Sequence, residues 1–339
     1  MAANSGIERF LHRFYLSNYF ISRASMEMEQ VVFGSRANKL TIGELVFVTG
    51  LARSGTTALT NWIFSSGAYA SLQYANMPFL LIPNLWKNSK KITPHERAHK
   101  DGIMIHENSP EEFDEYFWKT FLEDAYISKQ LKLHAIEEKI LKKYLSYISL
   151  ICLAKGKQNY LSKNNNNILR LPDISKIKGS KILLLFREPL SHSQSLLKLH
   201  RYFSELQTKD PFALEYFNFL GHHEFGLNHK PFLLNKAINS KMIENDPNLI
   251  DYWLLNWINY YQYLLENPCE NCHFISFSDL IGNQEKVISY LNHKVLMSAQ
   301  IPRQKKYLPQ AYPVLNCNKD LLQKATLIYE KLKLLRKYP

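Results

Sequence analysis

Cysteine, glycine and proline are scarce in this chain, and each shortage excludes a class of protein. Four Cys among 339 residues are too few for the disulfide framework of a small secreted domain. The 12 Gly and 14 Pro exclude a collagen-like or linker-rich chain. With 46% apolar residues, a chain of this length can bury a core without disulfides or a structural metal.

Long apolar runs are also missing. No stretch approaches the roughly 18 uninterrupted apolar residues that a membrane-spanning helix needs. Residues 1–30 carry no short apolar core that ends in a small-residue cleavage site, as a secretory signal would. We therefore expect a protein of the reducing cytoplasm with no integral membrane segment.

Acidic residues are outnumbered by basic ones. The 42 Lys and Arg against 30 Asp and Glu give a net charge of +12, which suits an anionic partner: nucleic acid, a membrane surface or a phosphorylated small molecule. A nucleic-acid binder would show a continuous basic face and steep salt dependence, without need of the phosphate loop described below.

Three short apolar runs predict buried strands, at residues 45–48, 182–186 and 274–277. Continuous rather than alternating apolar residues are typical of parallel strands that are covered on both faces. Long helical segments separate the runs, and this alternation predicts an α/β fold with a mostly parallel sheet.

The ends of the chain and the regions between the strands read as helical. Ile7, Phe10, Leu11, Phe14 and Tyr15 recur at the spacing of one helix face, which predicts an N-terminal arm that either packs on its own domain or lies on a membrane surface. We expect one domain over 1–339, with the arm at 1–42, a nucleotide-binding core at 43–70 and 156–200, helical acceptor-side regions at 71–155 and 201–270, and a C-terminal strand, basic loop and helix at 271–339.

The strongest motif follows the first predicted strand and reads GLARSGTT over residues 50–57. In a strand–loop–helix of this kind, backbone N–H groups and the positive end of the helix dipole hold an anion. The loop departs from the ATP-binding pattern because Thr56 stands where Lys is expected, and the cation is Arg53 instead. We therefore expect the loop to bind a phosphate other than the γ-phosphate of ATP.

A second motif follows the second predicted strand. Arg187-Glu188-Pro189 comes directly after the apolar run, and Ser195 stands eight residues beyond the arginine. A guanidinium offers a bidentate fork to a phosphate, and a serine hydroxyl early in the next helix can donate to the same anion.

Together the two motifs resemble those of the PAPS-dependent sulfotransferases, where PAPS is 3′-phosphoadenosine 5′-phosphosulfate, the sulfonate donor. The resemblance implies a P-loop three-layer α/β/α fold with a central parallel sheet and helical cap insertions. It implies that Arg187 and Ser195 hold the 3′-phosphate. It places the 5′-phosphosulfate on Arg53, Ser54, Gly55, Thr56 and Thr57.

Weaker matches extend the resemblance. Lys163-Asn164 is similar to a Lys-Asn or Lys-Thr element near the transferred group. Phe277-Ser278-Asp279-Leu280 is similar to a Tyr-Glu-Asp-Leu segment, with Phe277 in place of the tyrosine. Downstream, Arg303, Lys305 and Lys306 either close over the 3′-phosphate, as a basic loop does in that family, or form a solvated basic loop.

Sulfonate transfer is an in-line displacement related to phosphoryl transfer. We expect Arg53 and Lys163 to neutralise the developing charge, so that no metal is required. The resemblance implies a glutamate as general base in the segment that corresponds to residues 71–78, but this segment contains Gln73 and Asn76 and no carboxylate or histidine. The candidates further on are His99, Asp101, His106, Glu107, Glu111 and Glu115.

Two of these candidates carry an alternative interpretation. Glu111 and Glu115 are four residues apart, so on a helix they would share one face and could bind acceptor hydroxyls. Alternatively, the acidic run is the solvated start of a helix, with Ser109 as N-cap and Pro110 in the first turn.

Cys269-Glu270-Asn271-Cys272-His273 matches the haem-attachment pattern C-x-x-C-H. That chemistry needs an exported protein, and a zinc site would need two further ligands. We expect two ordinary thiols before a strand.

The leading prediction is a PAPS-dependent sulfotransferase that acts on a hydroxyl of a carbohydrate or polysaccharide precursor. Golgi members of the family carry a membrane anchor, and its absence here predicts a bacterial cytoplasmic enzyme. The alternatives are a P-loop nucleotide kinase or NTPase, and a PAPS-binding protein that has lost catalysis. The acceptor's identity, the sulfated position and the oligomeric state do not follow from the sequence.

Overall fold

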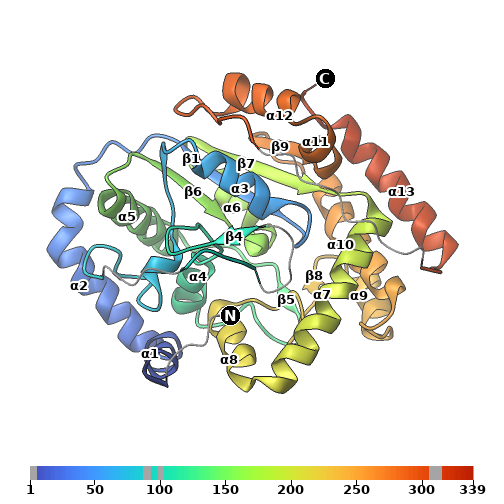
Figure 1. The fold of residues 1–339 in the computed structure, drawn as a ribbon, viewed down its shortest axis with the longest axis horizontal. Helices are drawn as coiled ribbons and strands as arrows, with labels where there is room; N and C mark the ends of the chain where they lie inside the picture. The colour runs from blue at the N-terminus through green and yellow to red at the C-terminus, as the bar shows by residue number, and fades with distance from the viewer. Residues whose placement is uncertain (1–5, 87–92, 98–102, 305–314, 339) are drawn as a thin grey trace.

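A five-stranded parallel sheet lies at the centre of the molecule, in the order β2-β6-β1-β7-β9 (Figure 1). The computed structural model describes residues 6–86, 93–97, 103–304 and 315–338. The carboxyl ends of β1, β6 and β7 meet at one edge, where Val48 pairs with Lys163 and Leu183. The central strands are β1 (Leu45–Gly50), β2 (Tyr69–Ala70), β6 (Asn159–Lys163), β7 (Ser180–Phe186) and β9 (Cys272–Ser276); small two-stranded sheets join β3 (His95–Glu96) to β4 (Met104–Ile105) and β5 (Leu131–Lys132) to β8 (Phe232–Leu233).

Helices cover both faces of this sheet. Successive residues of β1 face opposite sides: Leu45 and Phe47 belong to a large core with α2, α4, α5, α7, α10 and α13, whereas Val46 and Val48 belong to a smaller core with α3 and α12. The helices are α1 (Gly6–Leu16), α2 (Tyr19–Ala37), α3 (Thr56–Phe64), α4 (Glu115–Leu122), α5 (Glu138–Lys155), α6 (Leu171–Ser175), α7 (Pro189–Lys209), α8 (Pro211–Leu220), α9 (Lys236–Ile243), α10 (Ile250–Glu266), α11 (Phe277–Gly282), α12 (Gln284–Tyr290) and α13 (Lys319–Leu334), with short helical turns η1 (Tyr74–Asn76), η2 (Asn165–Arg170) and η3 (Leu291–Val295).

The three strands predicted from apolar runs are confirmed as β1, β7 and β9. Strand β6 carries no such run, because only Tyr160 and Leu161 of its five residues are apolar, although its last four residues are buried. Its polar side chains are satisfied by specific bonds: Asn159 accepts from the backbone N–H of Glu44, and Ser162 donates to Asp114. A strand of this kind is invisible to apolar patterning.

The N-terminal arm packs on its own domain with a face that only partly overlaps its apolar stripe. Its buried residues are His12, Tyr15 and Leu16. Two stripe residues, Ile7 and Phe10, are 74% and 62% exposed. The arm is held against α8 by ion pairs of Arg9 with Asp210 and of Arg13 with Glu215. An apolar strip on α1 is therefore left facing outward.

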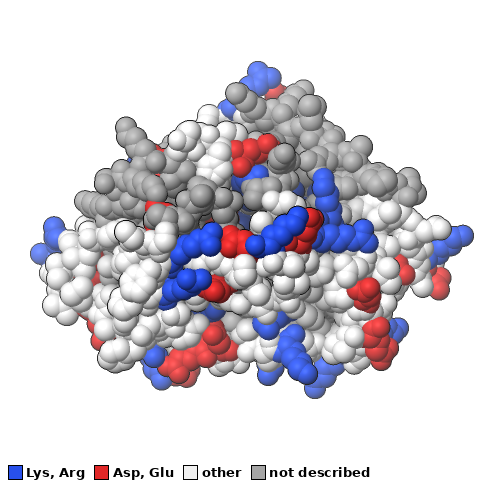
Figure 2. All heavy atoms as spheres, turned by 60° about the horizontal axis from the view of Figure 1, so that its bottom comes forward, with Lys and Arg blue, Asp and Glu red and all other residues white. Residues whose placement is uncertain are grey.

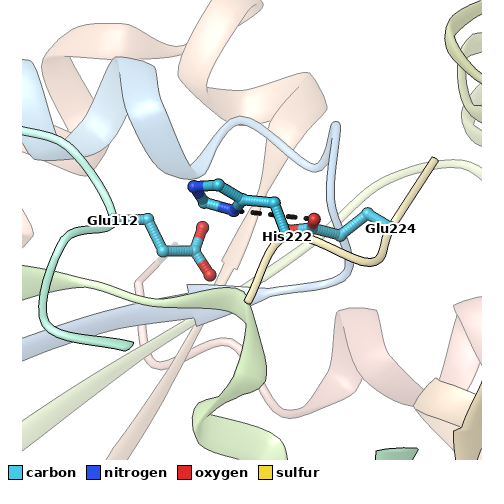
Figure 3. A group of neighbouring side chains, drawn as sticks. All are labelled: Glu112, His222 and Glu224. Carbon is cyan, nitrogen blue, oxygen red and sulfur yellow. Dashed lines mark ion pairs between the residues drawn. The ribbon is translucent and has the colours of Figure 1, made fainter. Parts of the chain in front are cut away.

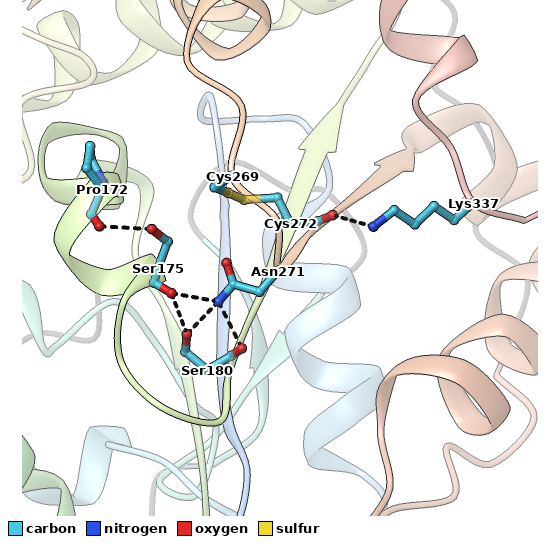
Figure 4. The surroundings of a disulfide bond; sticks show 7 residues. All are labelled: Pro172, Ser175, Ser180, Cys269, Asn271, Cys272 and Lys337. Atoms are coloured by element: carbon cyan, nitrogen blue, oxygen red, sulfur yellow. Dashed lines mark hydrogen bonds between the residues drawn. A yellow bond between two sulfur atoms is a disulfide. The ribbon is translucent and has the colours of Figure 1, made fainter.

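Cys269 and Cys272 are joined in a disulfide directly before β9 (Figure 4). The expectation of two ordinary thiols is therefore wrong. Between them, the Asn271 side chain donates to the backbone oxygens of Ser175 and Ser180 at 3.1 and 3.0 Å. These bonds tie the turn to the start of β7.

Among the described residues, no helix combines the length and the hydropathy that a bilayer-spanning segment requires.

Candidate active site

The phosphate loop runs from the end of β1 to the first turn of α3. Gly55, the residue before α3, has φ of 102° and supplies no side-chain cap, so its left-handed backbone suits glycine. A Cβ on Gly55 would lie 2.7 Å from the ring of Phe277. Arg53 also has a positive φ, 71°. Residues other than glycine that adopt this left-handed conformation cluster at functional sites. The loop thus presents the start of α3 as an anion site.

The two predicted phosphate motifs meet in space. Arg53 Nε donates to Ser195 Oγ at 3.3 Å, and Arg187 Nη1 donates to the Arg53 carbonyl at 3.4 Å. The two segments are far apart in sequence and come together because β1 and β7 are neighbours in the sheet. The structure therefore brings together the residues that the sequence selected separately.

Arg187 is held by its surroundings. Its guanidinium lies 4.5 Å from the ring centroid of Phe277, a cation–π geometry. Its carbonyl accepts from Trp257 Nε1 at 3.1 Å. The next residue, Glu188, caps α7 by accepting from the backbone N–H of Ser191 at 2.7 Å, with Pro189 in the first turn. These contacts fix the arginine at the end of β7.

A buried histidine, His192, forms a hydrogen bond with the backbone of the phosphate loop. His192 Nε2 lies 2.7 Å from the Ala52 carbonyl, and a neutral ring donates its proton there. Burial, followed by the charge of Arg187, lowers the pKa of His192 to about 3. His192 is thus a structural donor rather than a titrating group near neutral pH.

Lys163, the last residue of β6, sits between two carboxylates. Its Nζ lies 2.7 Å from Glu111 Oε1 and 3.0 Å from Glu112 Oε2. Burial opposes the charge of the ammonium, but Glu111 and Glu112 outweigh it and raise the pKa of Lys163. Burial likewise opposes ionisation of Glu111, but Lys163 and Arg97 lower its pKa to about 2. Lys163 and Glu111 are therefore both charged at neutral pH.

Next to Lys163 lies a group that no spacing in the sequence predicts: Glu112, His222 and Glu224 (Figure 3). Their nitrogen and oxygen donor atoms all lie within 4.8 Å of one another. His222 Nδ1 is 3.7 Å from Glu224 Oε2, and its other ring nitrogen is on the side of the ring away from Glu224 (Figure 3). A carboxylate behind one ring nitrogen is the arrangement that orients a histidine for proton transfer at the other.

The electrostatics of this group favour a proton acceptor. Burial opposes the charge of His222, but Glu224, with Glu112, raises its pKa above the usual value. Burial raises the pKa of Glu112, even though Lys163 acts in the opposite direction. Because the Lys163 ammonium already neutralises Glu112 at 3.0 Å, we assign the group to proton transfer rather than to a cation.

Asn165 connects this group to the phosphate loop. Its backbone N–H donates to Glu112 Oε1 at 2.6 Å, and its side chain donates to Glu224 Oε1 at 3.2 Å. Its side-chain oxygen accepts from the Thr56 hydroxyl at 3.4 Å. Asn165, one residue of the run Asn164–Asn167, thus positions both carboxylates.

A cavity of about 800 Å³ opens between the phosphate loop and the helical regions. Its described lining contains Arg53, but neither Arg187 nor Ser195. Arg53 therefore stands between the cavity and the Arg187–Ser195 pair. The polar residues of its lining include Arg53, Thr56, Thr57, Glu111, Glu112, Lys163, Asn165, His222 and Glu224.

Glu115 is not part of this cavity, and its assignment to catalysis or to acceptor hydroxyls has to be corrected. Its carboxylate forms two bonds with Arg170, at 2.7 and 3.0 Å. Both side chains are 0% exposed. The helix α4 begins at Glu115 with Asp114 as its N-cap, so Glu111 precedes it and no helix face joins the two glutamates. Ser109 and Pro110 do not start this helix.

Other predicted residues fall outside the assembled site. Arg303 is exposed and pairs with Glu285 at 3.3 Å, so the structure does not bring it to Arg187. His99, Asp101, Lys305 and Lys306 lie outside the described residues.

In residues 71–78, which contain no candidate base, Gln73 and Asn76 form hydrogen bonds that hold the local structure. Gln73 donates through Nε2 to the Asn108 carbonyl at 2.8 Å and accepts from Lys155, and Asn76 accepts from the Gln73 backbone N–H at 2.9 Å. His106 lines the cavity, with its Nδ1 accepting from the Asn108 N–H at 3.2 Å.

The sequence pattern does not single out His222 and Glu224. They follow Gly221, the left-handed cap of α8. A His and a Glu two residues apart in a loop after a helix are a weak signal of function, and nothing in their spacing from Lys163 connects them to it.

Basic and acidic side chains are interleaved on the face that carries α1 and α8 (Figure 2). The ion pairs Arg9–Asp210 and Arg13–Glu215 belong to this part of the molecule. A continuous basic field, which a nucleic-acid binder would need, is not present on this face among the described residues.

No protein-family model matches the chain, and no curated protein matches it. Among solved structures, sulfotransferase STF9 from Mycobacterium avium superposes with a TM-score of 0.50 at 11% identity, covering 99% of this chain and 85% of that one. Sulfotransferase STF1 from Mycobacterium tuberculosis H37Rv gives a TM-score of 0.46 at 13% identity, covering 96% and 82%. The sulfotransferase domain from the curacin biosynthetic pathway gives 0.32 at 14%, covering 74% and 72%. The likeness to STF9 confirms the predicted fold class.

Proposed function

We propose that this protein is a PAPS-dependent sulfotransferase. The observation that carries the proposal is the convergence of Arg53, Arg187 and Ser195 at the ends of β1 and β7. The donor set fits the ligand: two guanidinium groups, an ammonium and three hydroxyls, from Thr56, Thr57 and Ser195, suit a nucleotide with a 3′-phosphate and a 5′-phosphosulfate. Arg187 and Ser195 would hold the first group, and residues 53–57 the second.

The residues around the cavity divide the catalytic work. The acceptor oxygen forms a bond to sulfur while the bond from sulfur to the bridging phosphate oxygen breaks, and adenosine 3′,5′-bisphosphate leaves. His222 takes the hydroxyl proton at Nε2, and Glu224 stabilises the resulting imidazolium. Arg53 and Lys163 neutralise the charge on the sulfonate and on the leaving oxygen. Protein cations supply this role, so we propose that no metal is required.

The assignment of His222 as base disfavours the alternative of a PAPS-binding protein without catalysis. That alternative follows from the lack of a carboxylate or histidine at residues 71–78. His222 lines the same cavity as Lys163 and Arg53, so a proton acceptor is available from another segment. The kinase alternative is disfavoured by Thr56 in place of the lysine that contacts the γ-phosphate.

The acceptor expected from the sequence is a hydroxyl of a carbohydrate or polysaccharide precursor, reached in the cytoplasm. Within the proposal, the acceptor hydroxyl enters through the cavity that Lys163 and His222 line.

A transfer assay tests the proposal. The protein is incubated with ³⁵S-labelled PAPS and a panel of alcohols, and transfer and bisphosphate release are followed together. We expect equal amounts of both, and a loss of about 10²–10⁴ in the rates of both with H222Q. Release of labelled free sulfate by the wild type and H222Q alike, without transfer, would contradict it.

A further inference from the structure

The acceptor-side wall of the cavity is strongly apolar. Leu199 and Phe203 of α7 face Phe217 and Leu220 of α8, and the rings of Phe203 and Phe217 lie 4.9 Å apart. The apolar and aromatic residues of the described lining are Leu11, Ala52, Tyr74, Met77, Pro78, Trp86, Ile105, Phe113, Leu199, Phe203, Tyr216, Phe217, Leu220 and Phe225.

The polar groups of the same lining are largely engaged with one another. Arg97 lies 3.7 Å from Glu111 Oε2 and donates to the Thr57 hydroxyl at 3.3 Å. His12, on the α1 side, has Nδ1 2.7 Å from the Glu8 carbonyl. Burial lowers the pKa of His12, so this end of the cavity carries a neutral ring packed against Tyr216 at 5.7 Å.

A bare sugar fits this wall poorly. Every hydroxyl that leaves water must find a new hydrogen-bond partner or lose free energy. Aromatic faces can stack on a sugar ring, but they offer no partners for its hydroxyls. An apolar chain or ring has the opposite requirement, because it gains free energy in proportion to the apolar surface that it buries.

We infer that the acceptor is an amphiphilic alcohol: its hydroxyl lies at Lys163 and His222, and an attached alkyl or aryl group fills the space between α7, α8 and residues 74–78. The inference rests on the proposed function for its polar end. It narrows the carbohydrate expectation, since a sugar hydroxyl of a glycolipid satisfies both requirements and an unmodified polysaccharide does not.

A chain-length series tests the inference by binding. Methyl, butyl and octyl β-D-glucosides are titrated calorimetrically into the protein, with and without adenosine 3′,5′-bisphosphate. All three carry the same sugar, so only the apolar group changes. We expect one octyl glucoside per chain, with an affinity at least about 100-fold above that of methyl glucoside, because each buried methylene contributes about threefold to fourfold.

Two variants locate the chain. F217S should weaken octyl glucoside at least about tenfold and leave the bisphosphate affinity unchanged. F20S is the control, because Phe20 is 77% exposed and outside the cavity lining, and it should bind octyl glucoside as the wild type does. Equal affinity for methyl and octyl glucosides, no binding of either, or equal losses in both variants would overturn the inference. If the wild type bound octyl glucoside but not the bisphosphate, the proposed function would be contradicted instead. The two outcomes are distinguishable, because octyl glucoside is also titrated in the absence of the bisphosphate.

Such an acceptor reaches the cavity either dissolved or from a bilayer. The helix α1 lines the cavity with Leu11 and exposes Phe10 and Phe14 outward. Transfer is therefore measured to methyl and octyl glucosides in solution and to a glucosyl diacylglycerol in phosphatidylcholine vesicles. A rate loss for vesicles alone in the F10S/F14S variant indicates a bilayer source. Equal rates in variant and wild type indicate a dissolved one. Both results support an amphiphilic acceptor, whereas transfer only to methyl glucoside contradicts it.

Discussion

Arg53 Nε donates a hydrogen bond to Ser195 Oγ at 3.3 Å, which joins the loop after β1 to the helix after β7. Arg53 is also the cation of the phosphate loop and lines the acceptor cavity. One side chain thus lies between the residues assigned to the 3′-phosphate and those assigned to the transferred group. Within the proposed function, the Arg53–Ser195 contact couples binding of the 3′-phosphate to the position of the cation beside the transferred sulfonate.

Removing the serine hydroxyl should weaken nucleotide binding. In S195A, Arg53 and the 3′-phosphate both lose a partner, and a hydrogen bond to a charged group is worth about 1.5–3 kcal/mol. We expect the Kd of adenosine 3′,5′-bisphosphate to rise about tenfold or more by calorimetry. The matched control is S191A on the same helix, whose hydroxyl donates to the Glu188 carbonyl at an exposed position. Similar affinities for the two variants would refute the assignment of Ser195.

Lys163 should act on the rate more than on donor affinity. Replacing it in K163M keeps the length of the side chain but removes the cation beside the transferred sulfonate. Loss of one such charge-stabilising group costs about 10²–10³ in kcat. We expect that loss in transfer assays, with at most a small change in bisphosphate affinity. K155M is the comparison, since Lys155 bonds to Gln73 and does not line the cavity. A K163M variant with the wild-type kcat would count against the mechanism.

Activity should rise with pH through the titration of His222. The base must be neutral, and Glu224, with Glu112, raises the pKa of His222 above its usual value against burial, while Lys163 acts to lower it. The acidic limb of kcat/KM should therefore lie above the usual histidine pKa. E224Q removes the carboxylate that raises the pKa of His222. The acidic limb of its kcat/KM profile should therefore move to lower pH.

The histidine itself has a separate test. H222Q cannot accept the proton, and the loss of a general base costs about 10²–10⁴ in kcat. The residual rate should no longer show the His222 limb. An H222Q profile that keeps the wild-type limb, together with an E112Q profile that loses it, would move the base from His222 to Glu112.

The buried pair of Glu115 and Arg170 should matter for stability and not for ligand binding. E115Q leaves the guanidinium uncompensated in the core, and breaking such a pair costs about 3–5 kcal/mol. Urea unfolding should show this loss, with bisphosphate affinity unchanged in the folded protein. The control E138Q breaks an exposed pair with Lys142 and should unfold as the wild type does. A stable E115Q with reduced transfer would instead restore a catalytic role.

The same pair gives stability a direction with pH. Burial opposes ionisation of Glu115, but Arg170 lowers its pKa below the usual value. A carboxyl group with a lowered folded-state pKa stabilises the fold above its unfolded pKa, and this contribution is lost as the pH falls toward the lowered value. Unfolding of the wild type should therefore become easier on acidification through that range, and E115Q should lack this component.

The sequence predicts that the loops after β1 and β7 lie together, as they do, and the reason is local. Gly50, Gly55 and Arg53 are recognisable because they sit in one loop after one apolar strand, and Arg187 with Ser195 repeats the arrangement one strand away. Parallel strands carry such loops to the same edge of the sheet, so a linear pattern is enough to predict the meeting of β1 and β7.

The group of Glu112, His222 and Glu224 and the apolar wall of the cavity could not be predicted in this way. Glu112 and His222 come from loops that precede α4 and follow α8, and only the packing of those helices brings the two loops beside Lys163. For Glu115, periodicity suggested a helix face shared with Glu111, but the helix begins at Glu115 itself. The buried charge of Glu115 is paired with Arg170, which lies far along the chain from it.

The most direct test of the account is calorimetric binding of adenosine 3′,5′-bisphosphate, compared with ATP and Mg²⁺, to the wild type, R187A and R303A. The account predicts micromolar binding of the bisphosphate and much weaker binding of ATP. It predicts that R187A loses bisphosphate binding, whereas R303A keeps it because Arg303 pairs with Glu285 at the surface. Tighter binding of ATP than of the bisphosphate, or undiminished bisphosphate binding by R187A, would contradict the central claim that the loops after β1 and β7 form one site for the sulfonate donor.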